Sequence, residues 1–261
     1  MMAPSFIYQL LLILMTAFTS AKSDSIGRVN KCDDRIIGGY EVDITDIPFQ
    51  VSLDFFFLGH FCGGVVISRR WVLTAGHCVG GDFTALGVFV RFGSTFSDRG
   101  GLVVTLKRAV QHPKYNDNTL DYDVTLLELG RDLPLDDQFY AVDLPEQDEP
   151  IEDGHCVLVS GWGVTHARVD RLHAVHVPIV NFEECREVYK DMNHVTRRMI
   201  CAGYPEGGKN ACYGDSGGPM VDGRKLIGLV SWGVPYAAPG YPGVYTRVAA
   251  IRNWITQVSK V

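Results

Sequence analysis

Between residues 36 and 250 the chain consists of short apolar or alternating segments separated by turn-forming residues. Residues 49–53 alternate apolar and polar side chains, and residues 226–230 form a short, almost continuous apolar run. Segments of this length and pattern predict β-strands, and the apolar run predicts a buried one. Glycine pairs, which favour tight turns, separate many of the segments, at 38–39, 63–64, 80–81, 100–101, 207–208 and 217–218. We therefore expect a fold made mainly of strands and hairpins.

The end of the chain follows a different period. Apolar residues recur there at i, i+3, i+4 and i+7, as Ile251, Trp254, Ile255 and Val258. This spacing predicts an amphipathic helix that packs against the rest of the protein. Residues 145–154 are acidic and contain proline, a composition typical of a linker between two halves.

Composition and length fit a folded globular protein. Hydrophobic residues make up 46% and charged residues 21% of the 261 residues, which are ordinary fractions. The length suits one large all-β domain or two smaller ones. The formal net charge is −6 and no basic run occurs, so we expect no nucleic-acid partner, because an acidic surface repels phosphate.

The first residues are typical of a secretion signal. Residues 6–18 are apolar apart from two positions, and small residues follow at 19–21, which predicts a signal peptide over residues 1–21. A membrane anchor is the alternative, but the run is shorter than the ~20 apolar residues that span a bilayer. We therefore expect a secreted, extracellular protein without membrane association.

Four local motifs carry candidate chemistry. His77 stands directly before a cysteine, Asp123 precedes an apolar segment, and Ser216 lies in a glycine-rich stretch. Arg35 precedes the apolar residue Ile36, which makes a basic cleavage point in front of a new apolar amino terminus. Each motif alone is weak, but their joint occurrence strongly indicates a nucleophilic site.

The chemistry of acyl transfer explains these residue types. A serine hydroxyl such as that of Ser216 needs a base within hydrogen-bond reach to become a nucleophile. A histidine such as His77 accepts that proton near neutral pH and returns it to the leaving group. A buried carboxylate, here Asp123, fixes the imidazole tautomer and stabilises the imidazolium. Glycines beside the serine let backbone N–H groups approach a developing oxyanion.

Together these motifs resemble the chymotrypsin/trypsin family of secreted serine endopeptidases, over residues 36–261. The chain order His77, Asp123, Ser216 matches that family and differs from the order in subtilisins and α/β-hydrolases. Further stretches that resemble family motifs are residues 160–163, 231–233 and 242–245.

The resemblance implies an all-β fold of two antiparallel six-stranded β-barrels with a C-terminal α-helix and an active site in the cleft between the barrels. We expect the first barrel at about 36–144, the linker at about 145–154, and the second barrel with the helix at about 155–261. Residues 22–35 are then an activation propeptide.

The resemblance also implies roles for individual residues. Ser216 is the nucleophile, His77 the general base and acid, and Asp123 the orienting carboxylate. Asp121, although acidic and nearby, does not match the family position. The backbone N–H groups of Gly214 and Ser216 form the oxyanion hole.

Activation and substrate binding are implied in the same way. Cleavage after Arg35 frees the α-ammonium group of Ile36, which pairs with Asp215. Residues 231–233 bind the substrate backbone as a short strand. The positions matching the substrate pocket are Asn210, Ala211, Tyr213, Ser231, Trp232, Gly233 and Gly243.

The pocket departs from the trypsin pattern at one position. Asn210 occupies the floor position where trypsins carry an aspartate, and Gly233 and Gly243 leave the pocket walls open. A neutral pocket of this kind favours large uncharged side chains over Arg or Lys. The alternative is that the carbonyl oxygen of Asn210 still binds basic side chains.

Seven cysteines imply that at least one is left over. No C-x-x-C pair occurs, which argues against a zinc site. The resemblance implies Cys62–Cys78 and Cys185–Cys201 disulfides. Cys32, Cys156 and Cys212 lack their family partners, and we expect at most one further bridge among them, Cys32–Cys156.

We expect no cofactor and no metal. Asp98 is the only acidic residue between Gly93 and Leu102, where some trypsins bind calcium, and calcium needs several oxygen ligands. Expected partners are protein or peptide substrates, an activating trypsin-like protease and protein protease inhibitors, and we expect a monomer. Digestion is a role suggested by the resemblance. The alternatives are a non-catalytic homologue that acts as a binding module and, less consistent with the motif order, an esterase of another fold.

Overall fold

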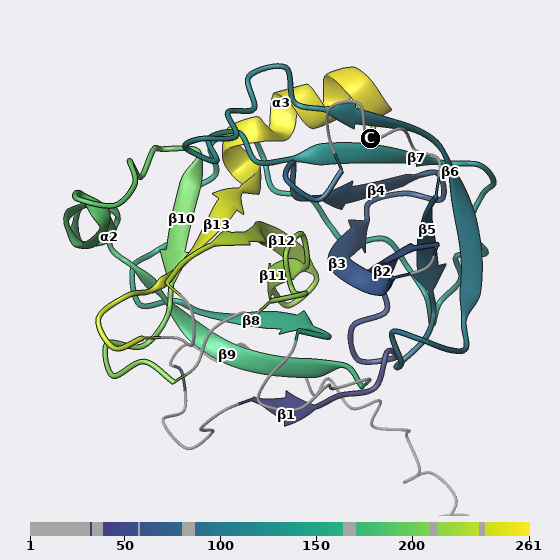
Figure 1. Cartoon of the computed structure of the whole chain (residues 1–261), viewed down its shortest axis with the longest axis horizontal. Helices are drawn as coiled ribbons and strands as arrows, with labels where there is room; N and C mark the ends of the chain where they lie inside the picture. The colour runs from purple at the N-terminus through teal and green to yellow at the C-terminus, as the bar shows by residue number, and fades with distance from the viewer. Residues whose placement is uncertain are drawn as a thin grey trace, which may run out of the picture.

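The computed structural model describes residues 32, 39–56, 58–79, 87–163, 171–208, 213–234 and 238–261. Its strands form two closed antiparallel barrels that stand side by side (Figure 1). The expectation of two six-stranded barrels followed by a C-terminal helix is therefore confirmed.

The first barrel closes in the order β2-β3-β4-β7-β6-β5. Its strands are β2 (Gln50–Phe55), β3 (Gly59–Val66), β4 (Trp71–Thr74), β5 (Val88–Phe92), β6 (Leu102–Gln111) and β7 (Thr125–Leu129). Strands β4 and β7 are neighbours, although about fifty residues separate them in the sequence, and Thr74 pairs with Thr125. The segment that follows β4 and the segment that precedes β7 therefore leave the barrel at the same end.

The second barrel runs β9-β10-β13-β12-β11-β8 and closes through a β8–β9 pairing, and β1 (Tyr40–Glu41) adds to the outside of β9. Its strands are β8 (Cys156–Gly161), β9 (His173–Val180), β10 (Met199–Ala202), β11 (Pro219–Asp222), β12 (Lys225–Trp232) and β13 (Gly243–Arg247). The apolar run at 226–230 lies within β12, as expected.

Two helices complete the described structure. Helix α3 (Val248–Ser259) follows β13 directly and buries Ile251 and Ile255 in a hydrophobic cluster with residues of both barrels, so the predicted amphipathic helix is confirmed. Helix α2 (Phe182–Tyr189) was not expected from the sequence. Its sequence signal is Asn181, whose side-chain oxygen accepts the N–H groups of the next turn in the manner of a helix cap.

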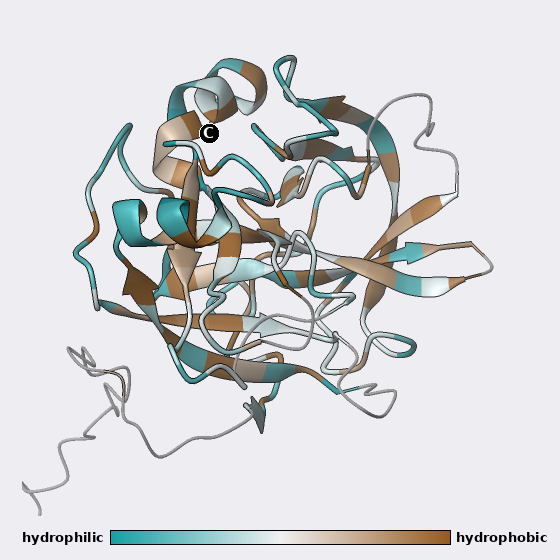
Figure 2. Cartoon of the chain, turned by 60° about the vertical axis from the view of Figure 1, so that its left-hand side comes forward, coloured by the Kyte–Doolittle hydropathy of each residue, from teal (hydrophilic) through white to brown (hydrophobic). Residues whose placement is uncertain are grey.

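The strands carry most of the hydrophobic residues, whereas α2 and many loops are hydrophilic (Figure 2). Among the described residues, no helix is long and apolar enough to cross a membrane. The distribution is that of barrels whose interiors exclude water and whose connections face it.

Strand β2 buries its polar face as well as its apolar one, because the second barrel covers it. Gln50 is fully buried, and its side-chain amide donates to the backbone oxygen of Ser160 at 3.0 Å. In return, the hydroxyl of Ser160, on β8, donates to the side-chain oxygen (Oε1) of Gln50 at 2.5 Å. This reciprocal pair joins the two barrels inside the protein, where an unpaired polar group is costly.

We predict that Gln50→Ala lowers the free energy of unfolding by about 1–3 kcal/mol, because it leaves the buried Ser160 hydroxyl without its acceptor. For a chain of this size each kcal/mol corresponds to roughly 2–4 °C in Tm. Thermal unfolding followed by circular dichroism measures the change. Gln257→Ala, at an exposed position of α3, is the matched control, and an equal loss in both variants would contradict the prediction.

Candidate active site

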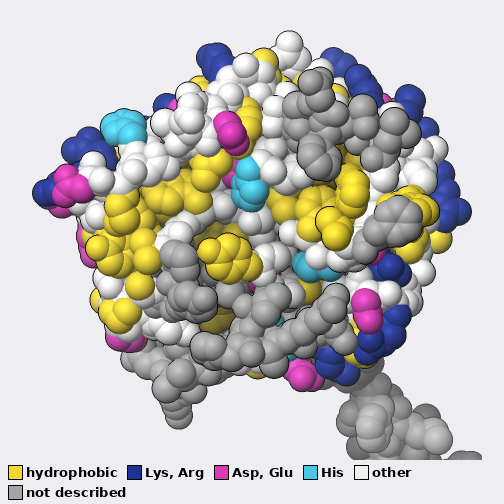
Figure 3. Space-filling view, in the orientation of Figure 1, with side chains coloured by type: hydrophobic (Ala, Val, Ile, Leu, Met, Phe, Trp, Pro, Cys, Tyr) yellow, Lys and Arg dark blue, Asp and Glu magenta, His cyan; other side chains and the backbone are white. Residues whose placement is uncertain are grey.

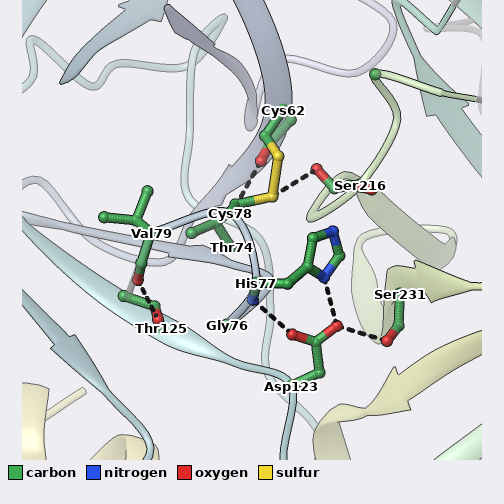
Figure 4. Close-up of a disulfide and its surroundings, with 12 residues drawn as sticks. Cys62, Thr74, Gly76, His77, Cys78, Val79, Asp123, Thr125, Ser216 and Ser231 are labelled. Carbon is green, nitrogen blue, oxygen red and sulfur yellow. Dashed lines mark hydrogen bonds and ion pairs between the residues drawn. A yellow bond between two sulfur atoms is a disulfide. The ribbon is translucent and has the colours of Figure 1, made fainter. Parts of the chain in front are cut away.

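The three residues of the expected triad come together where the barrels meet (Figure 4). His77 lies in the turn after β4, and Asp123 lies two residues before β7. Because β4 and β7 are paired neighbours, these two segments emerge together from the first barrel. Ser216 lies in the loop before β11 of the second barrel.

Asp123 is fully buried, and both of its carboxylate oxygens bind His77. Oδ1 accepts the backbone N–H of His77 at 2.8 Å, and Oδ2 lies 2.8 Å from the imidazole Nδ1. The hydroxyl of Ser231, on β12, donates to the same Oδ2 at 2.5 Å. A carboxylate can only accept, so the Nδ1 atom carries the proton and the Nε2 atom of a neutral His77 is left as an acceptor.

The pKa of His77 reflects two opposing effects. Burial lowers it, but the hydrogen bond and the negative charge of Asp123 outweigh burial and raise the pKa above its usual value. The side chain remains 27% exposed, so its outer edge is accessible. A histidine with a raised pKa and an accessible edge is well suited to take up and release a proton.

The backbone around Ser216 is fixed by both barrels. The carbonyl oxygen of Ser216 accepts the N–H of Gly63, on β3, at 2.8 Å. The next residue, Gly217, has φ 78° and donates to the carbonyl oxygen of Val230 at 2.7 Å. A Cβ atom at Gly217 would lie 2.2 Å from the Thr74 hydroxyl, so only glycine fits this position.

The residues before Ser216 are also held in place. Gly214 has φ 97°, a value that favours glycine, and its carbonyl oxygen lies 2.9 Å from the His60 Nε2 atom. The carboxylate of the buried Asp215 accepts the N–H of Gly163 at 2.7 Å. The loop is therefore held at Gly214 and Asp215.

The described pocket residues lie around this loop and the end of β12. Tyr213 is 69% exposed, Gly233 is exposed, and Gly243 begins β13. The half-buried ring of Trp232 meets the ring of Tyr189 edge to face at 4.8 Å. Asn210, Ala211, Arg35 and Ile36 lie outside the described residues.

Two second-barrel contacts to Asp123 were not expected from the sequence. Ser231 was assigned only to substrate binding, yet its hydroxyl bonds the buried carboxylate. Thr246, on β13, donates its hydroxyl to the backbone oxygen of Asp123 at 2.7 Å. No local motif marks these residues, because more than one hundred positions separate each of them from Asp123.

Three disulfides link the described cysteines, Cys62–Cys78, Cys185–Cys201 and Cys32–Cys156. The first joins β3 to the turn that carries His77 (Figure 4). It therefore restrains the position of the imidazole. Cys212 lies outside the described residues.

The described part of the chain offers little to a metal ion. One group of potential ligands lies close together, Cys62, His77 and Cys78, but its two sulfur atoms are joined in a disulfide and supply no thiolate. Ser97 and Gly100 lie in the loop before β6, and their backbone oxygens accept hydrogen bonds from the Arg91 side chain, on β5, at 3.0 and 2.8 Å. A guanidinium thus occupies two carbonyl oxygens that could otherwise bind a cation.

An aromatic stack supports the segment before Asp123. The buried imidazole of His112 stacks on the ring of Tyr122 with 4.4 Å between centroids and meets Trp254 of α3 at 4.8 Å. Its Nδ1 atom accepts the N–H of Lys114 at 3.2 Å, which fits a neutral ring. Burial, with a contribution from the charge of Lys114, lowers the pKa of His112 to about 4.

This lowered pKa predicts a loss of stability in acid. The unfolded chain takes up the proton near the ordinary histidine pKa of 6.5, and the folded chain takes it up only near 4. Neutral His112 therefore contributes its full stability at pH values above 6.5, the pKa in the unfolded chain. This contribution is lost as the pH falls from 6.5 to 4. His112→Phe keeps an aromatic ring, so the Tm of this variant should fall less over that range than that of the unmodified protein.

Thermal unfolding at pH values of about 7, 5.5 and 4 tests this prediction. The exposed His194 provides the matched control, because His194→Phe makes the same replacement at an exposed position outside the aromatic stack. A His112→Phe variant that loses Tm in parallel with the unmodified protein would show that His112 does not contribute to the acid sensitivity.

Known proteins resemble this chain over most of its length. A family model described as Trypsin matches residues 36–255. Trypsin 5G1 of Aedes aegypti is 47% identical over 228 residues, which cover 86% of this chain and 85% of that protein. A vitellin-degrading protease of Bombyx mori is 41% identical, with 86% of each chain covered. A trypsin of Simulium vittatum is 43% identical over 81% of this chain and 87% of its own.

Proposed function

Because this chain belongs to the trypsin family and is a serine-type endopeptidase, we propose that it cleaves protein or peptide substrates through an acyl-enzyme formed on Ser216. The observation that carries this proposal is the double contact of the buried Asp123 carboxylate with His77, at the backbone N–H and at Nδ1. That contact leaves the Nε2 atom of His77 as the base on the side of Ser216.

The reaction follows from this proton arrangement. The Oγ atom of Ser216 attacks the scissile carbonyl carbon while the Nε2 atom of His77 takes the hydroxyl proton. The imidazolium, stabilised by Asp123, then gives that proton to the leaving amine as the peptide C–N bond breaks. Water attacks the resulting ester with the same histidine as base, and the acid product and free Ser216 are released.

The backbone N–H groups of Gly214 and Ser216 stabilise the oxyanion that forms in each attack. The left-handed backbone at Gly214 and the fixed Gly217 support this role, since a donor must be oriented before charge develops. Residues 231–233 bind the substrate backbone as an added strand at the end of β12. Hydrophobic side chains gather around the centre of the face in Figure 3, as a peptide-binding surface requires.

The alternative is a homologue that binds proteins without cleaving them. Such a protein has no need for a buried carboxylate that binds one histidine at two atoms, because burying a charge is costly. The geometry at Asp123 therefore favours the enzyme.

We predict that Ser216→Ala lowers kcat by at least about 10⁴-fold with little change in KM, because the nucleophile acts only in the chemical step. His77→Ala should have a similar effect, and the double variant should lose no more than either single variant. Steady-state hydrolysis of a peptide substrate measures kcat and KM. Labelling by an organophosphate shows whether a reactive serine is present.

Ser68→Ala is the matched control for this prediction. Ser68 lies in the β3–β4 turn, at the opposite end of β4 from His77, so its loss should leave kcat unchanged. Full activity of the Ser216→Ala protein would exclude the proposed mechanism.

Specificity is the finer part of the proposal. Asn210 supplies no charge at the floor position of the pocket, so a Lys or Arg side chain would enter without a charged partner. We place large uncharged side chains, such as Phe, Tyr or Leu, in this pocket. The absence of side chains at Gly233 and Gly243 supports that size.

Activation and location complete the proposal. The enzyme is secreted through the signal peptide at residues 1–21 and is activated by cleavage after Arg35, and the α-ammonium of Ile36 then pairs with Asp215. The burial of the Asp215 carboxylate beside Gly163 supports this role. Because the pocket disfavours arginine, a separate trypsin-like protease in the same secretion performs the cleavage, and digestion of protein is the role.

We predict that Asn210→Asp raises kcat/KM for cleavage after Arg and Lys by roughly two to four decades, because the new carboxylate pairs with the buried cation. The same change should let the purified precursor activate itself. A peptide library gives the specificity, and sequencing of the new Ile36 terminus follows activation with and without a trace of trypsin.

Asn253→Asp, on the exposed side of α3, adds the same charge away from the pocket and should change neither property. Rapid self-activation of the unmodified precursor, together with a strong preference for Arg and Lys, would contradict the role given to Asn210.

A further inference from the structure

We propose that Asp121 and Arg198 form a positioning pair that holds Asp123 in register with His77 from the second barrel. This inference rests on the proposed role of Asp123 as the orienting carboxylate. It assigns a task to an acidic residue that lies two positions before Asp123 and takes no part in the triad itself.

The pair crosses between the barrels. Arg198, immediately before β10, donates through its Nε and Nη2 atoms to the two carboxylate oxygens of Asp121, at 3.2 and 2.5 Å. The hydroxyl of Thr196 donates to the same carboxylate at 2.8 Å. The backbone oxygen of Arg198 accepts the N–H of Arg247, on β13, at 2.8 Å, so the guanidinium extends from a fixed backbone.

The backbone on both sides of Asp121 is in an unfavourable conformation. Leu120 and Tyr122 both have φ 54°, in the left-handed region that residues other than glycine rarely adopt. Such residues persist where surrounding contacts hold them. The Asp121 carboxylate supplies one such contact, because it accepts three hydrogen bonds from Thr196 and Arg198 and a fourth from the N–H of Tyr122 at 3.0 Å.

The side chain of Tyr122 supplies the second contact. Its ring stacks on the imidazole of His112, with 4.4 Å between centroids, and the guanidinium of Arg198 lies over it, 5.0 Å from the centroid. Arg198 therefore holds this segment twice, through the carboxylate of Asp121 and through the ring of Tyr122. Removal of its guanidinium frees the backbone conformation on which the next residue depends.

Asp123 is sensitive to small movements of this segment. Its carboxylate has to meet the His77 backbone N–H and the Nδ1 atom at once, both at 2.8 Å. The N–H of Val124 donates to the backbone oxygen of Tyr122 at 2.8 Å, so Asp123 is enclosed in a tight turn. A change in the backbone conformation of Tyr122 therefore rotates the Asp123 carboxylate, because the tight turn leaves no other bond to take up the movement.

An ordinary surface ion pair would look different. Such pairs contribute little, since water competes with both groups. Here the Asp121 side chain is 16% and the Arg198 side chain 31% exposed, the contact is bidentate, and it joins elements that are 77 positions apart in the chain. Arg197, one residue earlier, forms the ordinary type, with a 68% exposed side chain paired to Glu183 on α2.

The test compares Arg198→Met with Arg197→Met in the activated enzyme. Concentrations are set by active-site titration, and kcat, KM and the pH dependence of kcat/KM are measured on a peptide that the unmodified enzyme cleaves. We expect Arg198→Met to lower kcat about 10- to 100-fold with KM nearly unchanged. The acid midpoint of kcat/KM should move to lower pH, because a displaced Asp123 stabilises the His77 imidazolium less.

Two further variants separate positioning from folding. Asp121→Asn keeps the size of the side chain and removes its charge, so it should reproduce both effects even if Arg198→Met does not fold. Arg198→Lys keeps the charge and should recover part of kcat. Arg197→Met should behave as the unmodified enzyme throughout.

The outcomes are distinct. An unchanged kcat and acid midpoint in Asp121→Asn or in folded Arg198→Met would overturn the inference, even with a lowered Tm, because the pair would then serve stability alone. Labelling of a Ser216→Ala protein by a small organophosphate would instead refute the proposed function. The two failures therefore cannot be confused.

Discussion

The buried carboxylate of Asp123 imposes the main constraint on this structure. A charge without access to water has to be surrounded by donors, and in the described part of the first barrel the donors to this carboxylate are the two N–H groups of His77. The remaining donors come from the second barrel, with Ser231 at the carboxylate and Thr246 at the backbone oxygen. The two barrels are therefore held in one relative position, and the imidazole is fixed with them.

The same need to hold the barrels together around Asp123 brings their backbones into close contact. A Cβ atom at Gly63 would lie 2.9 Å from the Cα atom of Gly218, and Gly217 is packed against the hydroxyl of Thr74. Gly63, Gly217 and Gly218, which the sequence marks as parts of turn signals, thus serve contact between the barrels, whereas Gly64 faces Val51 and Val72 of its own barrel. A hydropathy pattern identifies glycine as a local break, but it contains no information about a second backbone that approaches from elsewhere.

The sequence predicted best those features that depend on local order. The alternation at 49–53 predicted β2 and the helical spacing of apolar residues predicted α3, because each pattern reflects one buried face. The burial of the polar face of β2 escaped prediction, since only the folded second barrel covers Gln50. Helix α2 was missed because its apolar face is short, although the Asn181 cap was available as a signal.

The proposed reacting groups of the site could be predicted from the sequence because acyl transfer demands particular residue types, and the resemblance to the family supplies their chain order. The groups that orient them could not, because their contacts are made across the fold. Asp121 matches no motif, and its contact with Arg198 links positions 77 residues apart. The neutral substrate pocket stays a prediction from the residue types, since Asn210 lies outside the described residues.

The Cys32–Cys156 disulfide bears on what the proposed cleavage after Arg35 would do to the molecule. Cys32 is buried beside Cys156, on β8, across 124 positions of sequence. Hydrolysis of the 35–36 peptide bond leaves this sulfur–sulfur bond intact, so cleavage would yield two covalently linked chains rather than a released peptide. The mass of the protein would rise by one water, and the short chain would stay beside the second barrel at the high effective concentration of a tethered ligand. Only reduction would separate the two chains.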